Sequence, residues 1–149
     1  GLSSGVAGII KAVSPSTRVI GCSPANSAVM YHSLKAGQIL DLPSDPTLSD
    51  GTAGGVEPEA ITLGILDALL DDFVTVEEDA IREAFLELIE VEHLLVEGSA
   101  AMAYAAAKAH AATDARTAAG SSSRVPEGTT AVILCGGNVG VEKLREILA

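Results

Sequence analysis

Two short apolar runs constrain the fold of this chain more than any other feature. Residues 18–22 are rich in β-branched side chains and lie between two Ser-Pro signals, and residues 130–135 form a continuous apolar run that stops at Gly-Gly. Such runs are typical of strands in a parallel sheet that helices cover on both faces. Residues 73–76 are a weaker candidate strand. The sequence therefore predicts an α/β fold with three layers and a mainly parallel sheet.

Helices are predicted between and after these strands. A helix over residues 2–13 ends before Ser14-Pro15, because proline disfavours helical backbone in the residue that precedes it. Thr75 and Glu78 match a capping box, which predicts that a helix begins there. The other predicted helices cover residues 26–35, where Gly37 ends the helix, and residues 60–70, 98–110 and 141–148. Residues 111–128, rich in Ala, Ser, Thr and Gly, are interpreted mainly as a mobile surface loop.

The composition excludes several classes of protein. With 149 residues, 48% of them hydrophobic and 19% charged, the chain is long and apolar enough for one globular domain. The net charge of −11 disfavours nucleic acid and anionic membrane as partners. No apolar run is long enough to span a bilayer. Cys22 and Cys135 are far apart and match no metal-site spacing, so a reducing cytoplasm is the expected location.

Glycine-bearing turns are the candidate binding elements. Residues 1–5, Gly-Leu-Ser-Ser-Gly, lead directly into the first helix, whose free amides and dipole favour an anion such as phosphate. Cys135-Gly136-Gly137-Asn138 follow a predicted buried strand, and ligands of open α/β sheets bind beyond the carboxyl ends of strands. Each turn also has a simpler interpretation: an ordinary entry into a helix for the first, and a structural thiol for the second.

Two further positions are candidates on local grounds. Residues 49–55 form a second glycine-rich loop, which turn chemistry alone also explains. Glu97 stands between an apolar run and an alanine-rich helix, where a half-buried carboxylate is a candidate functional group. The alternative for Glu97 is an acidic residue that the helix dipole favours at a helix start.

The order of these motifs resembles that of the serine/threonine dehydratases, or threonine ammonia-lyases. The resemblance is carried by residues 1–5, 18–24, 49–51, 96–98 and 134–138, and so runs through nearly the whole chain. It implies a pyridoxal-phosphate enzyme with the tryptophan synthase β-like fold, fold type II. The implied reaction is β-elimination, which converts L-threonine or L-serine into a 2-oxo acid and ammonia.

The resemblance also implies roles for matching positions. The first residues of the chain match the end of the family's tetraglycine loop, which holds the cofactor phosphate. Cys135 stands where the family has a Ser, Cys or Thr beside the pyridine nitrogen, and a neutral partner there leaves that nitrogen unprotonated. The expected cofactor-binding residues are Gly1, Leu2, Gly51, Glu97, Cys135, Gly136, Gly137 and Asn138.

Other parts of the family's active site have no match in this sequence. The Schiff-base lysine lies in the family's N-terminal half, so the resemblance implies that residues 1–149 are the C-terminal portion of the catalytic domain, without a catalytic residue of their own. The chain alone is then expected to be inactive, and the missing half and a second subunit are its expected partners. Ser23 and Val29 replace the acidic residues of metal-binding relatives, so no divalent cation is expected.

Two alternatives stay open at this point. The first is a racemase of the serine racemase type, which shares the scaffold and differs by a base outside this sequence. The second is a non-catalytic α/β module that binds a ligand or a partner. A dinucleotide-binding domain is disfavoured, because no Gly-x-Gly-x-x-Gly motif follows a predicted strand.

Overall fold

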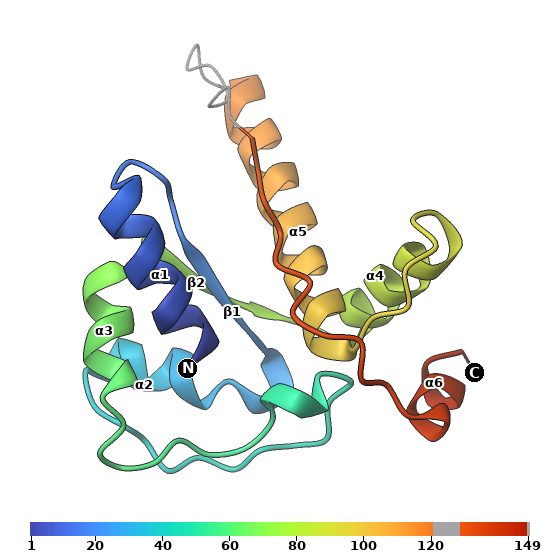
Figure 1. The fold of residues 1–149 in the computed structure, drawn as a ribbon, viewed down its shortest axis with the longest axis horizontal. Coiled ribbons are helices and arrows are strands. Elements are labelled where there is room, and N and C mark those ends of the chain that lie inside the picture. The colour runs from blue at the N-terminus through green and yellow to red at the C-terminus, as the bar shows by residue number, and fades with distance from the viewer. Residues whose placement is uncertain (121–128, 149) are drawn as a thin grey trace. The chain divides into compact units, whose positions relative to one another are not determined.

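The computed structural model describes residues 1–120 and 129–148, with no account of the side chains of residues 112–120. The chain forms two compact units, each described by itself below (Figure 1). The first unit comprises Gly1–Thr47 and Thr52–Glu77, and the second comprises Leu48–Gly51 and Glu78–Ala149.

The first unit contains a parallel pair of strands with three α-helices. Strand β1 pairs with β2 in register, Ile20 opposite Asp72 and Pro24 opposite Val76. Helix α2 contacts both strands, and α3 packs on both α1 and α2 (Figure 1). This arrangement confirms the α/β class and the parallel sheet. The elements are α1 (Leu2–Val13), β1 (Ile20–Pro24), the 3₁₀ turn η1 (Ala25–Ser27), α2 (Val29–Ala36), α3 (Thr62–Leu69) and β2 (Asp72–Val76). A further 3₁₀ turn, η2 (Asp50–Thr52), has Asp50 and Gly51 in the second unit and Thr52 in the first.

Helix α2 ends where the sequence predicts. Gly37 adopts a left-handed conformation (φ 68°), and its amide donates to the carbonyl of Leu34 while the amide of Gln38 donates to that of Ser33. These two bonds form a Schellman motif, which satisfies carbonyls left open at the helix end and favours glycine at the left-handed position. The prediction for Gly37 is confirmed.

Gly21 lets the two strands of the first unit pack closely. A Cβ atom at Gly21 would lie 2.6 Å from Cδ2 of its register partner Phe73 and 3.0 Å from Cδ1 of Leu70. We expect Gly21→Ala to lower the free energy of unfolding by about 1–3 kcal/mol, as overpacking of a filled site does. Urea denaturation measures this loss. Phe73→Leu, made in the Gly21→Ala background, should recover part of it, and strictly additive effects would contradict the packing explanation.

The second unit is helical, with α4 (Glu78–Glu90), α5 (Gly98–Gly120) and α6 (Val141–Leu148). Helix α4 packs on both α5 and α6, and its apolar face is the centre of the core. Arg82 of α4 donates hydrogen bonds to the carbonyls of Glu146 (2.8 Å) and Ile147 (2.5 Å), so a cation caps the end of α6. The buried side chains include Ile81, Phe85, Leu88, Ala100, Ala101, Met102 and Ile147.

A polar cluster joins α4 to α5. Tyr104 donates a hydrogen bond to Glu87 (2.8 Å), and Lys108 forms an ion pair with the same carboxylate. Lys108 and, to a smaller extent, Tyr104 hold the pKa of Glu87 below its ordinary value of 4.5. Since the folded state favours the carboxylate, the cluster stabilises the protein above that value and loses its contribution as the pH falls through the folded pKa.

The lowered pKa of Glu87 leads to a prediction of how stability depends on pH. The difference in thermal midpoint between wild type and Glu87→Gln should be small and destabilising at pH 7, because the pair is exposed. It should shrink as the pH falls below about 4.5 and disappear once the pH is below the lowered pKa of the folded state. Glu90→Gln, at the exposed end of the same helix, is the control. A difference that persists or grows in acid would contradict the assignment.

Three sequence predictions are wrong. Residues 130–135 form no strand: a strand needs a neighbour for its amides, and the only strands of the described residues, β1 and β2, pair with each other. Ile133 and Leu134 are correspondingly 47% and 37% exposed. The interpretation of residues 111–128 as a loop fails over 111–120, since α5 continues to Gly120, and residues 121–128 lie outside the described part. The capping box fails as a cap, because Thr75 belongs to β2 and Glu78 is already helical, although a helix does begin at this place, at Glu78.

Candidate functional site

Three segments of the second unit meet at the first turn of α5. The amide of Glu97 donates a hydrogen bond to the carbonyl of Gly136 (3.0 Å), which joins the start of α5 to the glycine turn. A Cβ atom at Gly51 would lie 3.9 Å from Oε1 of Glu97, and Sγ of Cys135 lies at the same distance from that oxygen. The structure therefore brings together four residues that the sequence predicts to bind the cofactor: Gly51, Glu97, Cys135 and Gly136.

Gly98 allows the segment 48–51 to lie directly on α5. A Cβ atom at Gly98 would lie 1.9 Å from the carbonyl oxygen of Leu48 and 2.6 Å from its carbonyl carbon. The Leu48 amide in turn donates to Oε2 of Glu78 (2.8 Å), so α4 holds the segment in place. The other oxygen of Glu78 is buried without a partner. Gly98 stands in the motif of residues 96–98, but the sequence assigned it no role, because its requirement arises from a backbone fifty residues away.

The carboxyl group of Glu97 fills the space beside Gly136. A Cβ atom at Gly136 would lie 2.6 Å from Cδ and Oε2 of Glu97 and 2.7 Å from Oε1. A glycine at this position thus lets the carboxylate and the turn approach each other, and leaves the turn itself as bare backbone. Such a turn can bring backbone groups close to a planar ligand.

A second polar contact involves a residue that the sequence analysis missed. Ser99 donates a hydrogen bond from Oγ to Oε1 of Glu97 (2.5 Å), and Sγ of Cys135 donates to Oγ of Ser99 at 3.4 Å. Ser99 is 5% exposed, whereas Cys135 is exposed. The only signal in the sequence was its place two residues after Glu97, in the first turn of α5.

The remaining residues of the turn are further from this cluster. A Cβ atom at Gly137 would meet only the carbonyl oxygen of Leu95, at 3.3 Å. The amide of Val139 donates to the carbonyl of Gly137 (3.0 Å), so the chain turns tightly around the exposed Asn138.

Gly1 and Leu2 belong to the first unit, at the start of α1. The carbonyl of Gly1 accepts hydrogen bonds from Oγ of Ser4 (2.9 Å) and from the amide of Gly5 (3.1 Å), which closes the first helical turn. The amides at such an end have no acceptor within the helix and point outward. The helix entry predicted from the sequence is confirmed, and the phosphate-binding role of Gly1 and Leu2 stays a prediction.

Metal and membrane features were sought in the same part of the chain. Within residues 1–120 and 129–148, no three His, Cys, Asp or Glu side chains cluster so as to hold a metal ion. In these residues, no helix is long and apolar enough to cross a membrane.

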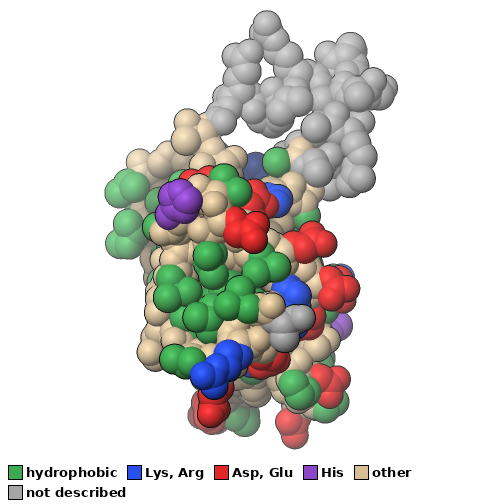
Figure 2. Space-filling model, turned by 90° about the vertical axis from the view of Figure 1, so that its right-hand side faces the viewer, with side chains coloured by type: hydrophobic (Ala, Val, Ile, Leu, Met, Phe, Trp, Pro, Cys, Tyr) green, Lys and Arg blue, Asp and Glu red, His purple; other side chains and the backbone are tan. Residues whose placement is uncertain are grey.

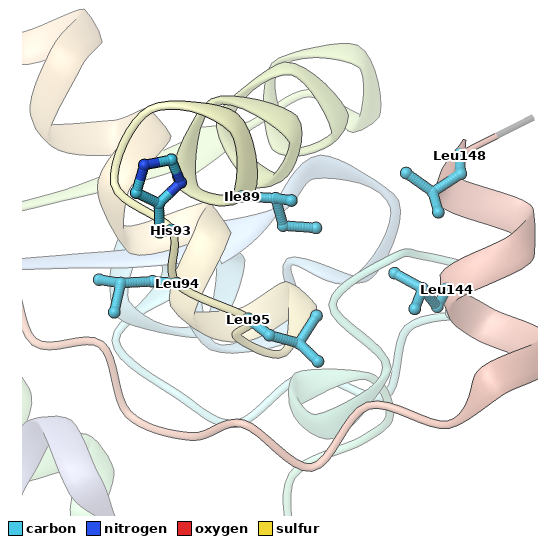
Figure 3. A pocket seen from close by; sticks show the side chains of 6 residues that line it. All are labelled: Ile89, His93, Leu94, Leu95, Leu144 and Leu148. Carbon is cyan, nitrogen blue, oxygen red and sulfur yellow. The ribbon is translucent and has the colours of Figure 1, made fainter.

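An apolar groove lies elsewhere in the second unit. It has a volume of about 410 Å³, and Leu144 and Leu148 point into it from α6 toward Ile89 and Leu95 (Figure 3). His93, which adopts a left-handed conformation (φ 57°) after α4, and Leu94 complete its lining. Figure 2 shows apolar side chains gathered near the centre of the face in view, among acidic side chains. The groove offers little polar chemistry, so the Glu97 cluster is the better candidate site.

Comparison with known proteins identifies the type of domain. The family model described as pyridoxal-phosphate dependent enzyme matches residues 1–136. The L-threonine ammonia-lyase of Geobacter sulfurreducens is 34% identical over 148 residues, which cover 99% of this chain and 34% of that enzyme. The chain therefore spans about a third of the length of that curated relative.

Solved structures agree on the fold. A crystal structure of the threonine deaminase of T.th. matches with a TM-score of 0.78 and 34% identity, over 93% of this chain and 45% of that one. The structure of maize serine racemase matches with a TM-score of 0.75 and 31% identity, over 97% of this chain and 42% of that one. The prediction of a fold shared with the threonine deaminases is confirmed.

Proposed function

Because the chain belongs to the family of pyridoxal-phosphate dependent enzymes, we propose that the protein of which it is part deaminates L-threonine or L-serine to a 2-oxo acid and ammonia. The observation that carries the proposal is the Glu97 cluster, where a thiol, a carboxyl group and a glycine turn converge. The names of the relatives, L-threonine ammonia-lyase and threonine deaminase, support the same reaction.

The residues present fit the family's cofactor. The carboxyl of Glu97 occupies the place where a side chain of residue 136 would project, so Glu97 and the turn are in direct contact and can face a flat ring together. Cys135, exposed at the start of that turn, offers a thiol as a weak donor or acceptor. The cofactor, when bound, supplies an electron sink for the substrate's α-carbon. The proposed cofactor-binding residues are Gly1, Leu2, Gly51, Glu97, Cys135, Gly136, Gly137 and Asn138.

Each group then has a definite task. The outward-pointing amides at the start of α1 bind the cofactor phosphate. Cys135 faces the ring nitrogen as a neutral group, which favours elimination over transamination because the ring carries no added positive charge. Glu97 and Gly51 shape the same wall of the site.

The rest of the active site is proposed to come from elsewhere in the longer protein. Residues 1–149 form the C-terminal portion of the catalytic domain, and neither Lys11, Lys35, Lys108 nor Lys143 matches the Schiff-base lysine motif. The chain by itself is then inactive and depends on the N-terminal half of the enzyme and on a second subunit. A reducing cytoplasm suits its cysteine usage, and no divalent cation is required at Ser23 or Val29.

A racemase of the serine racemase type is the second candidate, which the match to maize serine racemase favours. The two candidates share their cofactor and scaffold and differ in product. One experiment separates them: the full-length protein is incubated with L-threonine and with L-serine, and ammonia, 2-oxo acid and residual enantiomers are measured. We expect equal amounts of ammonia and 2-oxo acid. Formation of D-serine in excess of ammonia would favour the racemase, and no turnover of either amino acid would contradict both.

A further inference from the structure

We propose that Ser99 is a positioning residue that holds the Cys135 thiol in place through a directed pair of hydrogen bonds ending on Glu97. The inference rests on the proposed function, since it gives Cys135 its place beside the cofactor ring. Ser99 stands in none of the motifs that carry the family resemblance, and its role follows from contacts alone.

The donors and acceptors of the cluster fix the direction of the bond from Ser99 to Glu97 and leave two acceptors for the Cys135 proton, Oγ of Ser99 at 3.4 Å and Oε1 of Glu97 at 3.9 Å. A carboxylate only accepts hydrogen bonds, so the single proton of the Ser99 hydroxyl is directed at Oε1 of Glu97, 2.5 Å away. The Ser99 oxygen is then left as an acceptor, and Cys135 donates its S–H proton to it across 3.4 Å. With the nearer acceptor, the order of donation is Cys135 to Ser99 to Glu97.

Because Ser99 is buried, its side chain is held more firmly than that of Cys135, to which it is hydrogen-bonded. Ser99 is 5% exposed and belongs to the first turn of α5, where Gly98 packs against the backbone of Leu48. Cys135 lies in a stretch without regular structure and is exposed, so its own segment restrains it little. The Ser99 hydroxyl is thus the nearer of two groups that restrain the sulfur, because Oε1 of Glu97 lies farther away, at 3.9 Å.

The consequence concerns the direction of the thiol. The contact with Ser99 fixes the position of the Cys135 sulfur and leaves its exposed face to a cofactor ring. The thiol proton itself turns from Ser99 to the ring when the cofactor binds, because an unprotonated ring nitrogen only accepts hydrogen bonds. Without the Ser99 hydroxyl the sulfur loses its nearest partner and is free to rotate. Cofactor affinity should then fall, although the Ser99 side chain itself does not touch the ring.

A double-mutant cycle on the full-length protein tests this role. The dissociation constant of pyridoxal phosphate is measured for wild type, Ser99→Ala, Cys135→Ala and the double variant. In the wild-type background, we expect Ser99→Ala to raise the dissociation constant about tenfold, which is the effect of losing one hydrogen bond to a charge-linked group. In the Cys135→Ala background, we expect the same change to raise it less than about twofold. An equal effect in both backgrounds, or no effect in wild type, overturns the proposal.

A second measurement needs no cofactor and so separates this inference from the proposed function. The alkylation rate of Cys135 by iodoacetamide is followed by peptide mass spectrometry, with Cys22 as the internal reference. We expect Ser99→Ala to raise the Cys135 rate several-fold and Ser99→Thr, which keeps the hydroxyl, to leave it near wild type. An unchanged rate in Ser99→Ala, or the same rate in both variants, overturns the positioning role. A wild type that binds no pyridoxal phosphate but shows this pattern contradicts the proposed function alone.

Discussion

Replacing Gly98 with Ala should destabilise the second unit by about 3 kcal/mol, near the upper end for overpacking of a filled site. The added Cβ would meet the carbonyl oxygen of Leu48 at 1.9 Å, and a backbone group cannot move aside as a flexible side chain does. The segment would have to shift and pull the Leu48 amide from Glu78, which already has one buried oxygen without a partner. The loss of the hydrogen bond between the Leu48 amide and Glu78 then adds to the steric cost.

Chemical denaturation measures this effect, with Gly64→Ala as the matched control. Gly64 lies inside α3, and a Cβ atom there meets nothing within 4 Å. The control should therefore raise the free energy of unfolding by up to about 1 kcal/mol, the helix propensity difference between Gly and Ala. If both variants are stabilised alike, the close approach of Leu48 to Gly98 is not a feature of the folded protein.

Cys135→Asp should have the largest effect on activity. The new carboxylate would stand near 3.9 Å from Oε1 of Glu97, judged by the position of the sulfur. Two charges about 4 Å apart repel by about 1 kcal/mol in water and about 4 kcal/mol at an effective dielectric constant of 20. We expect elimination to slow by about fivefold to a thousandfold, the rate equivalent of that range. The negative group would also favour a protonated ring, so transamination-like products should increase.

The assay compares 2-oxo acid release from L-threonine by wild type, Cys135→Asp and the neutral control Cys135→Ser. The control should keep activity within a few-fold of wild type, because a hydroxyl replaces the thiol without adding charge. Product partition is scored in the same samples. If Asp and Ser at position 135 behave alike in rate and partition, the neutral group beside the ring nitrogen has no role.

The parts of the fold that depend on local sequence could be predicted. The limits of α1 and α6 agree with the structure, and Gly37 ends α2, because breakers and left-handed glycines act within one turn of the chain. Residues 130–135 show the limit of this reasoning. Their apolar pattern indicates a strand, but strand formation depends on a neighbouring strand, which residue patterns within the run do not reveal.

The candidate site shows the same difference between features that depend on local sequence and features that depend on contacts distant in the chain. Glu97, Cys135 and Gly136 were recognised because each stands in a motif that can be seen locally. Ser99 was not, and Gly98 was given no role within its motif, since the importance of both arises from contacts with residues about forty to fifty positions away in the chain. Glu78 was assigned to a capping box, yet its carboxylate accepts from the Leu48 amide, a partner thirty residues distant.

The absorption spectrum of the natively purified full-length protein, recorded before and after addition of L-threonine, tests the central claim most directly. We predict a visible band from bound pyridoxal phosphate that changes when L-threonine is added, while ammonia appears in solution. A colourless protein that stays colourless after incubation with pyridoxal phosphate would contradict the claim that this chain forms part of a cofactor site.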